Sequence, residues 1–225
     1  EFASLQVQDL RFDDTMSVPG AFDCSPAYYC KRGVALYRTT FSTMTACPDA
    51  LLKLGGIGLR GRFWLDSKEI GTVALPYSGM ELPLGALAAG EHELVAAIDN
   101  RFNKEQVTLF YPFYDFYAFG GFYRSVELHL LPEDWHIDRV QVKTLDYKTG
   151  KVKLNLKLSG NAPDTVNVKL RFDTEDCFRE VKMCGPDYSV DELVSDFKLW
   201  SPDNPALHKL ELKVGSEHIV ESFGI

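Results

Sequence analysis

The sequence predicts an all-β protein built from two sandwich domains, and two observations support this fold class. Apolar and polar residues alternate along many short segments, and the alternation is strict in VKLNLKL, residues 152–158. A period of two is typical of a strand with one buried face. Clusters of turn residues such as DYKTG and SGNAPD separate these segments, and no long segment combines a helical period with caps at both ends. We therefore expect short strands joined by turns.

The first part of the chain contains strand segments with longer loops between them. Strands are expected in ALYRTTF, RFWLDSKEIG, HELVAAIDN and SVELHLL. RFWLDSKEIG is expected to form two short strands about a turn at Asp66-Ser67, and HELVAAIDN to form a buried strand that ends at Asp99-Asn100. Gly55-Gly56 is expected in a strand with close backbone contacts. One short helical turn is expected at GALAAG, residues 85–90.

A change of composition predicts the domain boundary. The aromatic, glycine-rich part of the chain ends at Pro132, and short strands with Lys and Asp faces follow. Residues 1–132 have room for a two-sheet jelly roll or a similar sandwich. Residues 133–225 suit a seven-strand immunoglobulin-like sandwich, although they lack the Cys–Trp–Cys framework of true immunoglobulin domains.

Charge and hydropathy exclude several functional classes. The net charge of −8 argues against nucleic acid, because phosphates demand clustered Lys and Arg. No stretch approaches the roughly 18 apolar residues of a membrane-spanning helix, and no block of like charge indicates a membrane-surface anchor. The sequence predicts a soluble protein and leaves a cytoplasmic or periplasmic location open. The first residue is Glu1 rather than Met, so the lack of a signal sequence says little about the full protein.

Motifs for catalysis, metals or cofactors are not found in the sequence. The five cysteines are odd in number and are expected as reduced thiols, with a Cys177–Cys184 bridge left open. The histidines are scattered, and neighbouring carboxylates such as Asp13-Asp14 point to opposite faces of a strand or lie in loops. No nucleophile elbow or phosphate-binding loop is present. The sequence therefore predicts no metal, no cofactor and no catalytic residue within this chain.

The segment YPFYDFYAFGGFYRSV, residues 111–126, is the candidate binding site. It places one carboxylate, Asp115, among aromatic rings and before Gly120-Gly121. Sugars suit such a site, because their C–H faces pack on rings while their hydroxyls need fixed acceptors. A charge-assisted hydrogen bond contributes on the order of 1.5–3 kcal/mol where water is excluded. The alternative is an Asp115 side chain that bonds its own backbone in a turn.

Several motifs, in order from about residue 16 to residue 225, resemble the N-terminal part of glycoside hydrolase family 2, the β-galactosidase and β-glucuronidase family. DFYAFGGFYRSV resembles the signature that closes the sugar-binding domain, with Asp115, Gly121, Arg124 and Val126 at matching positions. MSVPGAF, ALYRTTF, LWSPDNPALHKLEL and the terminal FGI are similar to further family segments. The chain departs from the family pattern at Leu36, where Trp is usual, and at His208, where Tyr is usual.

The resemblance implies an architecture and a set of roles. It implies a galactose-binding-like jelly roll and an immunoglobulin-like sandwich, followed in the family by a catalytic (β/α)8 barrel that this chain lacks. It assigns substrate binding to Asp115, with Tyr114 and Tyr117 lining the rim or packing in the core. Arg124 and Gly121 are expected to be structural residues near the site.

The resemblance also implies a function. The chain is expected to be the non-catalytic N-terminal part of a retaining β-glycosidase, β-galactosidase-like, and inactive alone. The alternatives are a β-glucuronidase-like enzyme, a stand-alone carbohydrate-binding module and a scaffold protein. The expected partners are a β-galactoside or β-glucuronide and the barrel of the same polypeptide, and a homo-oligomer is left open.

Overall fold

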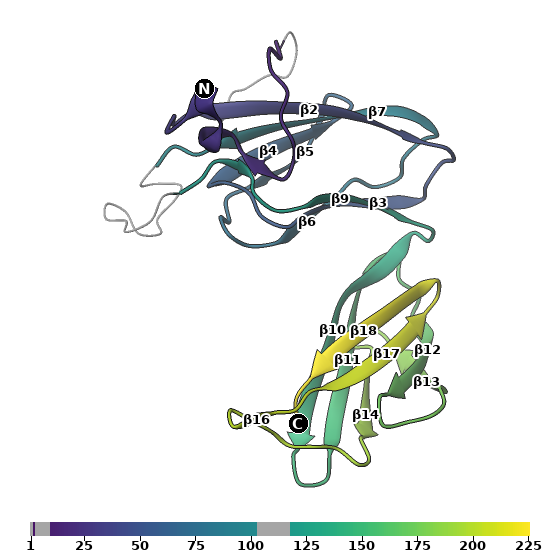
Figure 1. The fold of residues 1–225 in the computed structure, drawn as a ribbon. Helices are drawn as coiled ribbons and strands as arrows, with labels where there is room; N and C mark the ends of the chain where they lie inside the picture. Colours follow the sequence, from purple (N-terminus) through teal and green to yellow (C-terminus); the bar gives the residue numbers. More distant parts are fainter. Residues whose placement is uncertain (1, 3–9, 103–117) are drawn as a thin grey trace. The chain divides into compact units, whose positions relative to one another are not determined.

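The structure is a computed structural model that describes residues 2, 10–102 and 118–225. The chain divides into two compact units, Glu1–Leu131 and Pro132–Ile225 (Figure 1). The regular structure of the described residues consists of strands and of two short 3₁₀ turns, Phe22–Cys24 and Pro26–Tyr28. The prediction of an all-β protein is confirmed.

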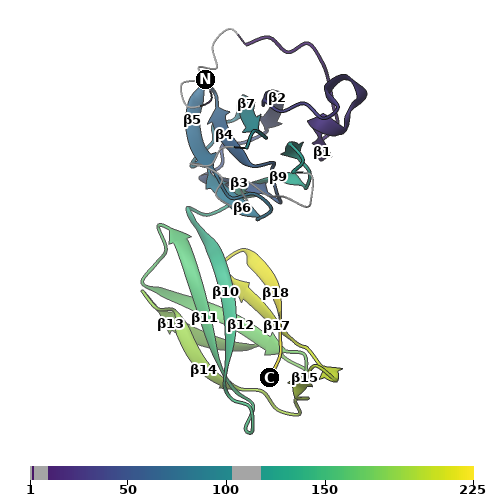
Figure 2. The same ribbon diagram turned by 90° about the vertical axis from the view of Figure 1, so that its left-hand side faces the viewer.

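The first unit contains two main antiparallel sheets that face each other (Figure 2). In one sheet the strand order is β2 (Val34–Thr43), β7 (Gly90–Asp99), β4 (Arg60–Leu65) and β5 (Lys68–Val73). In the other the order is β6 (Met80–Pro83), β3 (Asp49–Leu54) and β9 (Val126–Leu131). A short pair joins β1 (Gly20–Ala21) to β8 (Gly121–Phe122).

Alternation along the strands builds the core of the first unit. Leu54 of β3, Phe63 of β4 and Ile98 of β7 are almost completely buried in one cluster, which Phe122 of β8 also joins. Because neighbouring residues of a strand point to opposite faces, Trp64 lies on the other side of β4, in a smaller cluster. The strand that carries the candidate motif is thus tied into the hydrophobic core through Phe122.

The second unit is also a pair of antiparallel sheets. One has the order β10 (Trp135–Asp146), β11 (Lys151–Gly160) and β14 (Ser189–Leu193). The other has the order β13 (Arg179–Cys184), β12 (Thr165–Phe172), β17 (His208–Val214) and β18 (Glu217–Phe223). A short hairpin pairs β15 (Trp200–Ser201) with β16 (Asn204–Pro205).

The core of the second unit follows the predicted period of two. Val152, Leu154 and Leu156 of β11 are at most 3% exposed, and they pack against inward residues of β12 and β17. Lys153 and Asn155, which lie between them, point outward and are half-buried. The alternation of VKLNLKL is therefore confirmed as a strand with one buried face.

Two local expectations differ from the structure. GALAAG forms no helical turn, because Leu87 pairs with Cys47 in an isolated β-bridge and Gly85 has a φ of 71°. Gly55-Gly56 lies beyond the end of β3 rather than in a strand. The space at Gly56 is filled by a side chain rather than by backbone, since a Cβ there would lie 2.7 Å from the Tyr123 hydroxyl. All five cysteines are free thiols.

Candidate functional site

The predicted sugar-binding residues lie in a part of the chain about which the structure says nothing. Asp115, Tyr114 and Tyr117 belong to residues 103–117, outside the described residues. Their roles therefore stay predictions. The structure does describe the residues on both sides of this segment, Phe102 and Ala118, and the groups that hold them.

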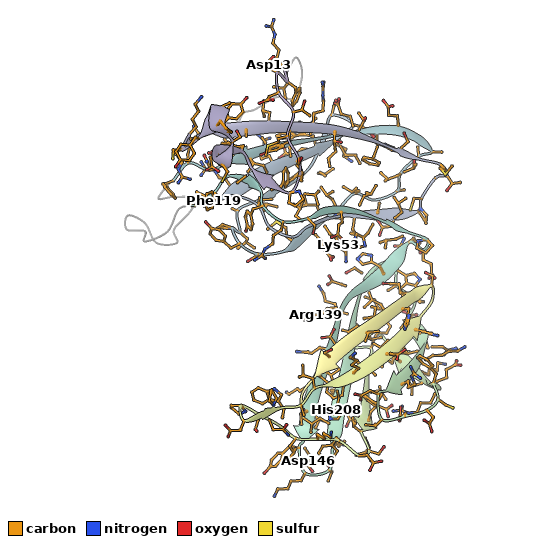
Figure 3. All side chains as sticks on the ribbon, viewed as in Figure 1. Asp13, Lys53, Phe119, Arg139, Asp146 and His208 are labelled. Carbon is orange, nitrogen blue, oxygen red and sulfur yellow. The ribbon has the colours of Figure 1, made fainter. Side chains whose placement is uncertain are left out.

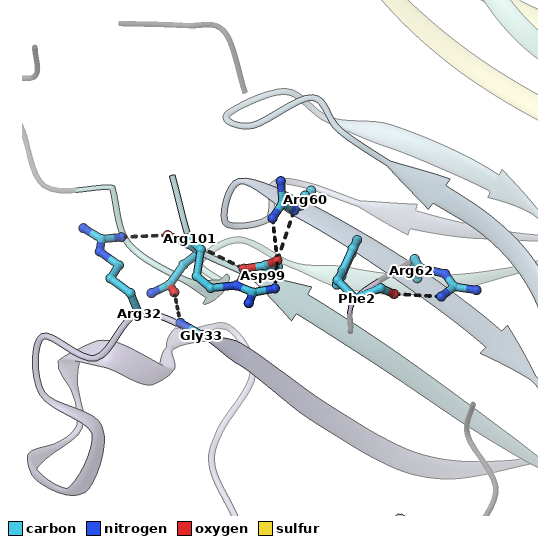
Figure 4. Close-up of polar contacts among 8 residues, drawn as sticks. Phe2, Arg32, Gly33, Arg60, Arg62, Asp99 and Arg101 are labelled. Carbon is cyan, nitrogen blue, oxygen red and sulfur yellow. Dashed lines mark hydrogen bonds and ion pairs between the residues drawn. The ribbon is translucent and has the colours of Figure 1, made fainter. Parts of the chain in front are cut away.

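Asn100, which directly follows β7, is fully buried and connects three parts of the first unit. Its side-chain amide donates to the Asp23 carboxylate at 2.8 Å and to the Lys31 carbonyl at 3.0 Å. Its side-chain oxygen accepts from the Gly33 amide at 2.8 Å (Figure 4). These bonds fix the backbone just before Phe102 against the loop that leads into β2.

Asp23 holds the chain on the other side of the segment. Its carboxylate is only 1% exposed and accepts the Gly120 amide at 3.1 Å, in addition to the bond from Asn100. The Phe22 amide in turn donates to the Gly120 carbonyl at 3.1 Å. A buried carboxylate needs such donors, because an unpaired charge in the interior is strongly unfavourable.

Arg32 contacts both flanks of residues 103–117. Its guanidinium donates to the Asn100 carbonyl at 3.2 Å and also to the Ala118 carbonyl. The same group lies 4.5 Å from the centre of the Phe102 ring. We call Asp23, Arg32 and Asn100 the anchoring cluster, because together they hold the two ends of the segment that carries Asp115.

An adjoining ion-pair group fixes the course of the chain after β7. Asp99 is fully buried and accepts from Arg60 at 2.6 Å and from Arg101 at 2.8 Å (Figure 4). Burial alone would raise the pKa of Asp99, but the hydrogen bonds from Arg101 and Arg60 outweigh it and hold the pKa below its usual value. Asp99 therefore stays ionised. Its role is to fix the positions of Arg60 and Arg101, and it does not transfer protons.

Gly121 occupies a position that only glycine fits without strain. Its φ is 103°, and a Cβ there would lie 2.6 Å from the hydroxyl of Tyr37. The Tyr37 hydroxyl is buried and unpaired among the described residues, and burial, together with the charge of Asp23, raises its pKa. Gly121 thus lets β8 pass close to the anchoring cluster.

Arg124 lies beside the turn after β3. It donates to the Gly55 carbonyl at 3.3 Å, and its guanidinium lies 5.7 Å from the centre of the Tyr123 ring. Tyr123 also contacts Tyr77, with 5.8 Å between ring centres. Phe119, between Ala118 and Gly120, is 43% exposed.

The anchoring cluster was not among the sequence-predicted site residues. Asn100 follows a strand that the sequence did predict, and a buried strand that ends in Asp99-Asn100 is the one signal that pointed to it. Asp23 and Arg32 come from loops without a strand period, 77 and 68 residues from Asn100 in sequence. Local patterns do not report contacts at such separations.

The anchoring cluster can position the backbone on both sides of residues 103–117. The buried carboxylates of Asp23 and Asp99 are engaged by donors, so neither is a free general base. Among the described residues no group of His, Cys, Asp and Glu could hold a metal ion. In the same ranges, no helix is long and apolar enough to cross a membrane.

Comparison with known proteins points to one family. Residues 135–225 match the family described as glycosyl hydrolases family 2. A β-galactosidase of Clostridium acetobutylicum is 26% identical over 163 residues, which cover 68% of this chain and 17% of that protein.

Solved structures share the fold over nearly the whole chain. A family 2 β-galacturonidase of Eisenbergiella tayi superposes with a TM-score of 0.77 at 19% identity, covering 93% of this chain and 38% of that one. A β-glucuronidase of Bifidobacterium dentium superposes with a TM-score of 0.74 at 17% identity, covering 93% and 42%. The chain thus spans well under half the length of these relatives. Residues 135–225 therefore match glycosyl hydrolases family 2, and nearly the whole chain shares its fold with a solved enzyme of that family.

Proposed function

We propose that the chain is the non-catalytic N-terminal part of a retaining β-glycosidase, β-galactosidase-like, which helps to form the substrate pocket of the full-length enzyme. The family match over the second unit and the curated β-galactosidase support the activity class. The observation that carries the role of this chain is the anchoring cluster, because it holds both ends of the segment with Asp115.

In this proposal Asp115 binds the sugar and transfers no proton. Its carboxylate accepts hydrogen bonds from substrate hydroxyls, and the rings of Tyr114 and Tyr117 pack beside the sugar. Accurate placement of the sugar lowers the barrier to reaction, because it removes orientational freedom before the chemical step. The anchoring cluster supports this role because it fixes the backbone on both sides of residues 103–117.

The reacting groups belong to the rest of the full-length enzyme in this proposal. A retaining glycosidase uses two carboxyl groups about 5–5.5 Å apart, one as acid/base and one as nucleophile. Asp23 and Asp99, the buried carboxylates among the described residues, are both engaged by hydrogen-bond donors. The full-length protein must therefore supply the catalytic pair, which the family carries on its barrel.

Asp115→Ala in the full-length protein tests the proposal. With p-nitrophenyl β-D-galactopyranoside, we expect kcat/KM to fall by roughly 30-fold or more, equivalent to about 2 kcal/mol of transition-state binding. Asp115→Asn should retain part of the activity, because the amide still offers a hydrogen-bond acceptor. Glu91→Ala, at an exposed carboxylate of the same unit, is the matched control and should leave kcat/KM unchanged.

The same assay separates the alternatives. An unchanged kcat/KM in Asp115→Ala would remove the site assignment. A preference for p-nitrophenyl β-D-glucuronide would favour the β-glucuronidase-like alternative, toward which the Asp99-Asn100 pair and the DFYAF pattern lean. Calorimetric binding of galactose by a full-length protein that hydrolyses neither substrate would favour a stand-alone carbohydrate-binding module.

A further inference from the structure

Large apolar side chains are exposed mainly at one end of the second unit, all of whose residues the structure describes. Six of the seven such side chains in this unit lie there, and Val220 is the exception. We call these six residues the apolar end: Leu145, Tyr147, Leu193, Leu199, Trp200 and Leu207.

Strand pairing places the first three of these residues together. β10 and β11 are joined by a turn after Asp146, and Asp146 pairs with Lys151. Lys151 also pairs with Leu193, the last residue of β14. Leu145 and Tyr147, on either side of Asp146, therefore lie near Leu193.

Hydrogen bonds bring the other three residues to the same end. The Trp200 amide donates to the Ile225 carbonyl at 2.7 Å, and the Thr144 hydroxyl donates to the Gly224 carbonyl at 3.1 Å. Leu207 directly precedes β17, whose first residue, His208, pairs with Phe223. Asp146 and His208 lie at this end of the unit (Figure 3), where β16 and the last residue of the chain also lie (Figure 1).

Strand pairing and hydrogen bonds fix the backbone of the apolar end. Trp200 pairs with Pro205 in the β15–β16 hairpin. The Lys198 amide donates to the imidazole of His208 at 3.0 Å, which ties the segment before this hairpin to β17. Trp200 is nevertheless 48% exposed and Leu207 is 59% exposed. Ordered backbone beneath exposed apolar side chains is typical of a preformed interaction surface.

The opposite end of the same unit has a different composition. Its turns expose Asn161, Asp164, Asp187 and Ser216. The Asn161 amide donates to the Asp134 carbonyl, which places this polar end where the chain enters the unit. The exposed apolar residues are therefore a property of one end and not of the whole surface.

We propose that the apolar end is the surface on which a further domain of the same polypeptide packs in the full-length protein. This inference rests on the proposed function, in which the remainder of the enzyme carries the catalytic pair. The solved β-galacturonidase shares the fold over 93% of this chain. That protein is longer, and this chain spans 38% of it. The Ile225 carbonyl accepts the Trp200 amide, so residues joined to Ile225 would begin beside the apolar end.

Thiol labelling of the full-length protein tests this inference. Leu207→Cys introduces a thiol in the apolar end, and Val220→Cys introduces one at a position of similar exposure, 52%, on the outer face of β18. Maleimide labelling is followed at the level of peptides by mass spectrometry, so the native thiols do not interfere. We expect the thiol introduced by Leu207→Cys to react at least about tenfold more slowly, because a packed domain excludes the reagent.

The outcomes separate the occupants of this surface. Equal labelling of the two variants in the native protein would overturn the proposal, including the case in which the full-length protein ends at Ile225. Protection that disappears on dilution would assign the surface to a second copy and would also overturn it. Labelling in denaturant must be equal for both variants. The hydrolysis assays with Asp115→Ala are independent of this result, so failure of the proposed function is recognised separately.

Discussion

Asn100 links the end of β7 to two loops, and its removal should weaken the first unit. Asn100→Ala removes two donated hydrogen bonds and one accepted bond, and it takes a donor away from the buried carboxylate of Asp23. We expect the free energy of unfolding to fall by about 2–3 kcal/mol, because buried groups are left unpaired. Urea unfolding of the chain, followed by circular dichroism, measures this change.

An exposed asparagine provides the control for that measurement. Asn161 also donates its side-chain amide to a carboxylate, that of Asp134, at 3.0 Å, but both residues are exposed. Asn161→Ala should therefore change the free energy of unfolding by less than about 0.5 kcal/mol. Equal effects of the two substitutions would contradict the importance of the anchoring cluster.

His92 should make the stability of the first unit depend on pH. One ring nitrogen lies 2.8 Å from the Asp66 carboxylate and the other lies 3.0 Å from the Ala88 carbonyl. Both partners are acceptors, so the protonated ring satisfies them best. The hydrogen bond to Asp66, followed by that to Ala88, raises the pKa of His92 above its usual 6.5.

The sign of the pH effect follows from the raised pKa. The stabilisation by protonated His92 is fully present below pH 6.5 and is lost as the pH rises through the higher folded-state pKa. Asp66 stays ionised in this range. Burial alone would raise its pKa, but hydrogen bonds from His92 and the Glu93 amide lower it. His92→Gln should therefore destabilise the chain more at about pH 5.5 than at about pH 8.5. Thermal melts at the two pH values compare the variants, and a pH-independent difference would refute the effect.

At the scale of secondary structure, β8 depends on a glycine with a left-handed backbone. Gly121→Ala places a methyl group against the Tyr37 hydroxyl and the Gly20 carbonyl at a φ of 103°. We expect a loss of about 1–3 kcal/mol in the free energy of unfolding. Gly33→Ala is the control, because nothing lies within 4 Å of its added Cβ. Gly33→Ala should be nearly neutral, and a neutral Gly121→Ala would show that β8 relaxes without cost.

The strands show which parts of the fold could be predicted from local sequence patterns. β11 could be predicted because Val152, Leu154 and Leu156 alternate with polar residues, and a period of two requires no knowledge of the partner strand. The turn at Asp66-Ser67 was also predictable, and both residues have positive φ values. The helical turn predicted at GALAAG was wrong, because its Leu87 pairs with Cys47, which lies 40 residues earlier in the chain (87 − 47). Tertiary pairing overrode a weak helical preference there.

The candidate site was less predictable than the strands. Asp115 stands out in sequence because a charge among aromatic rings is unusual, and its role remains a proposal. Local patterns do not reveal the anchoring cluster, because its residues flank the place where Val34, at the start of β2, pairs with Asp99, at the end of β7. Buried polar residues in loops carry no period that would identify them.

At the scale of the whole molecule, the chain by itself should be inactive. We expect the purified 225-residue chain to release no p-nitrophenol from β-galactoside or β-glucuronide substrates above the uncatalysed rate, because in the proposed function the catalytic carboxyl pair belongs to the rest of the full-length enzyme. The full-length protein under the same conditions is the positive control. Turnover by the purified chain that Asp115→Ala abolishes would refute the non-catalytic role.

The arrangement of Arg32 has a consequence for how such a protein can diversify. Every hydrogen bond described for the anchoring cluster is made outside residues 103–117. Arg32 bonds main-chain carbonyl groups, which every amino acid carries, so its bond at position 118 does not depend on which side chain stands there.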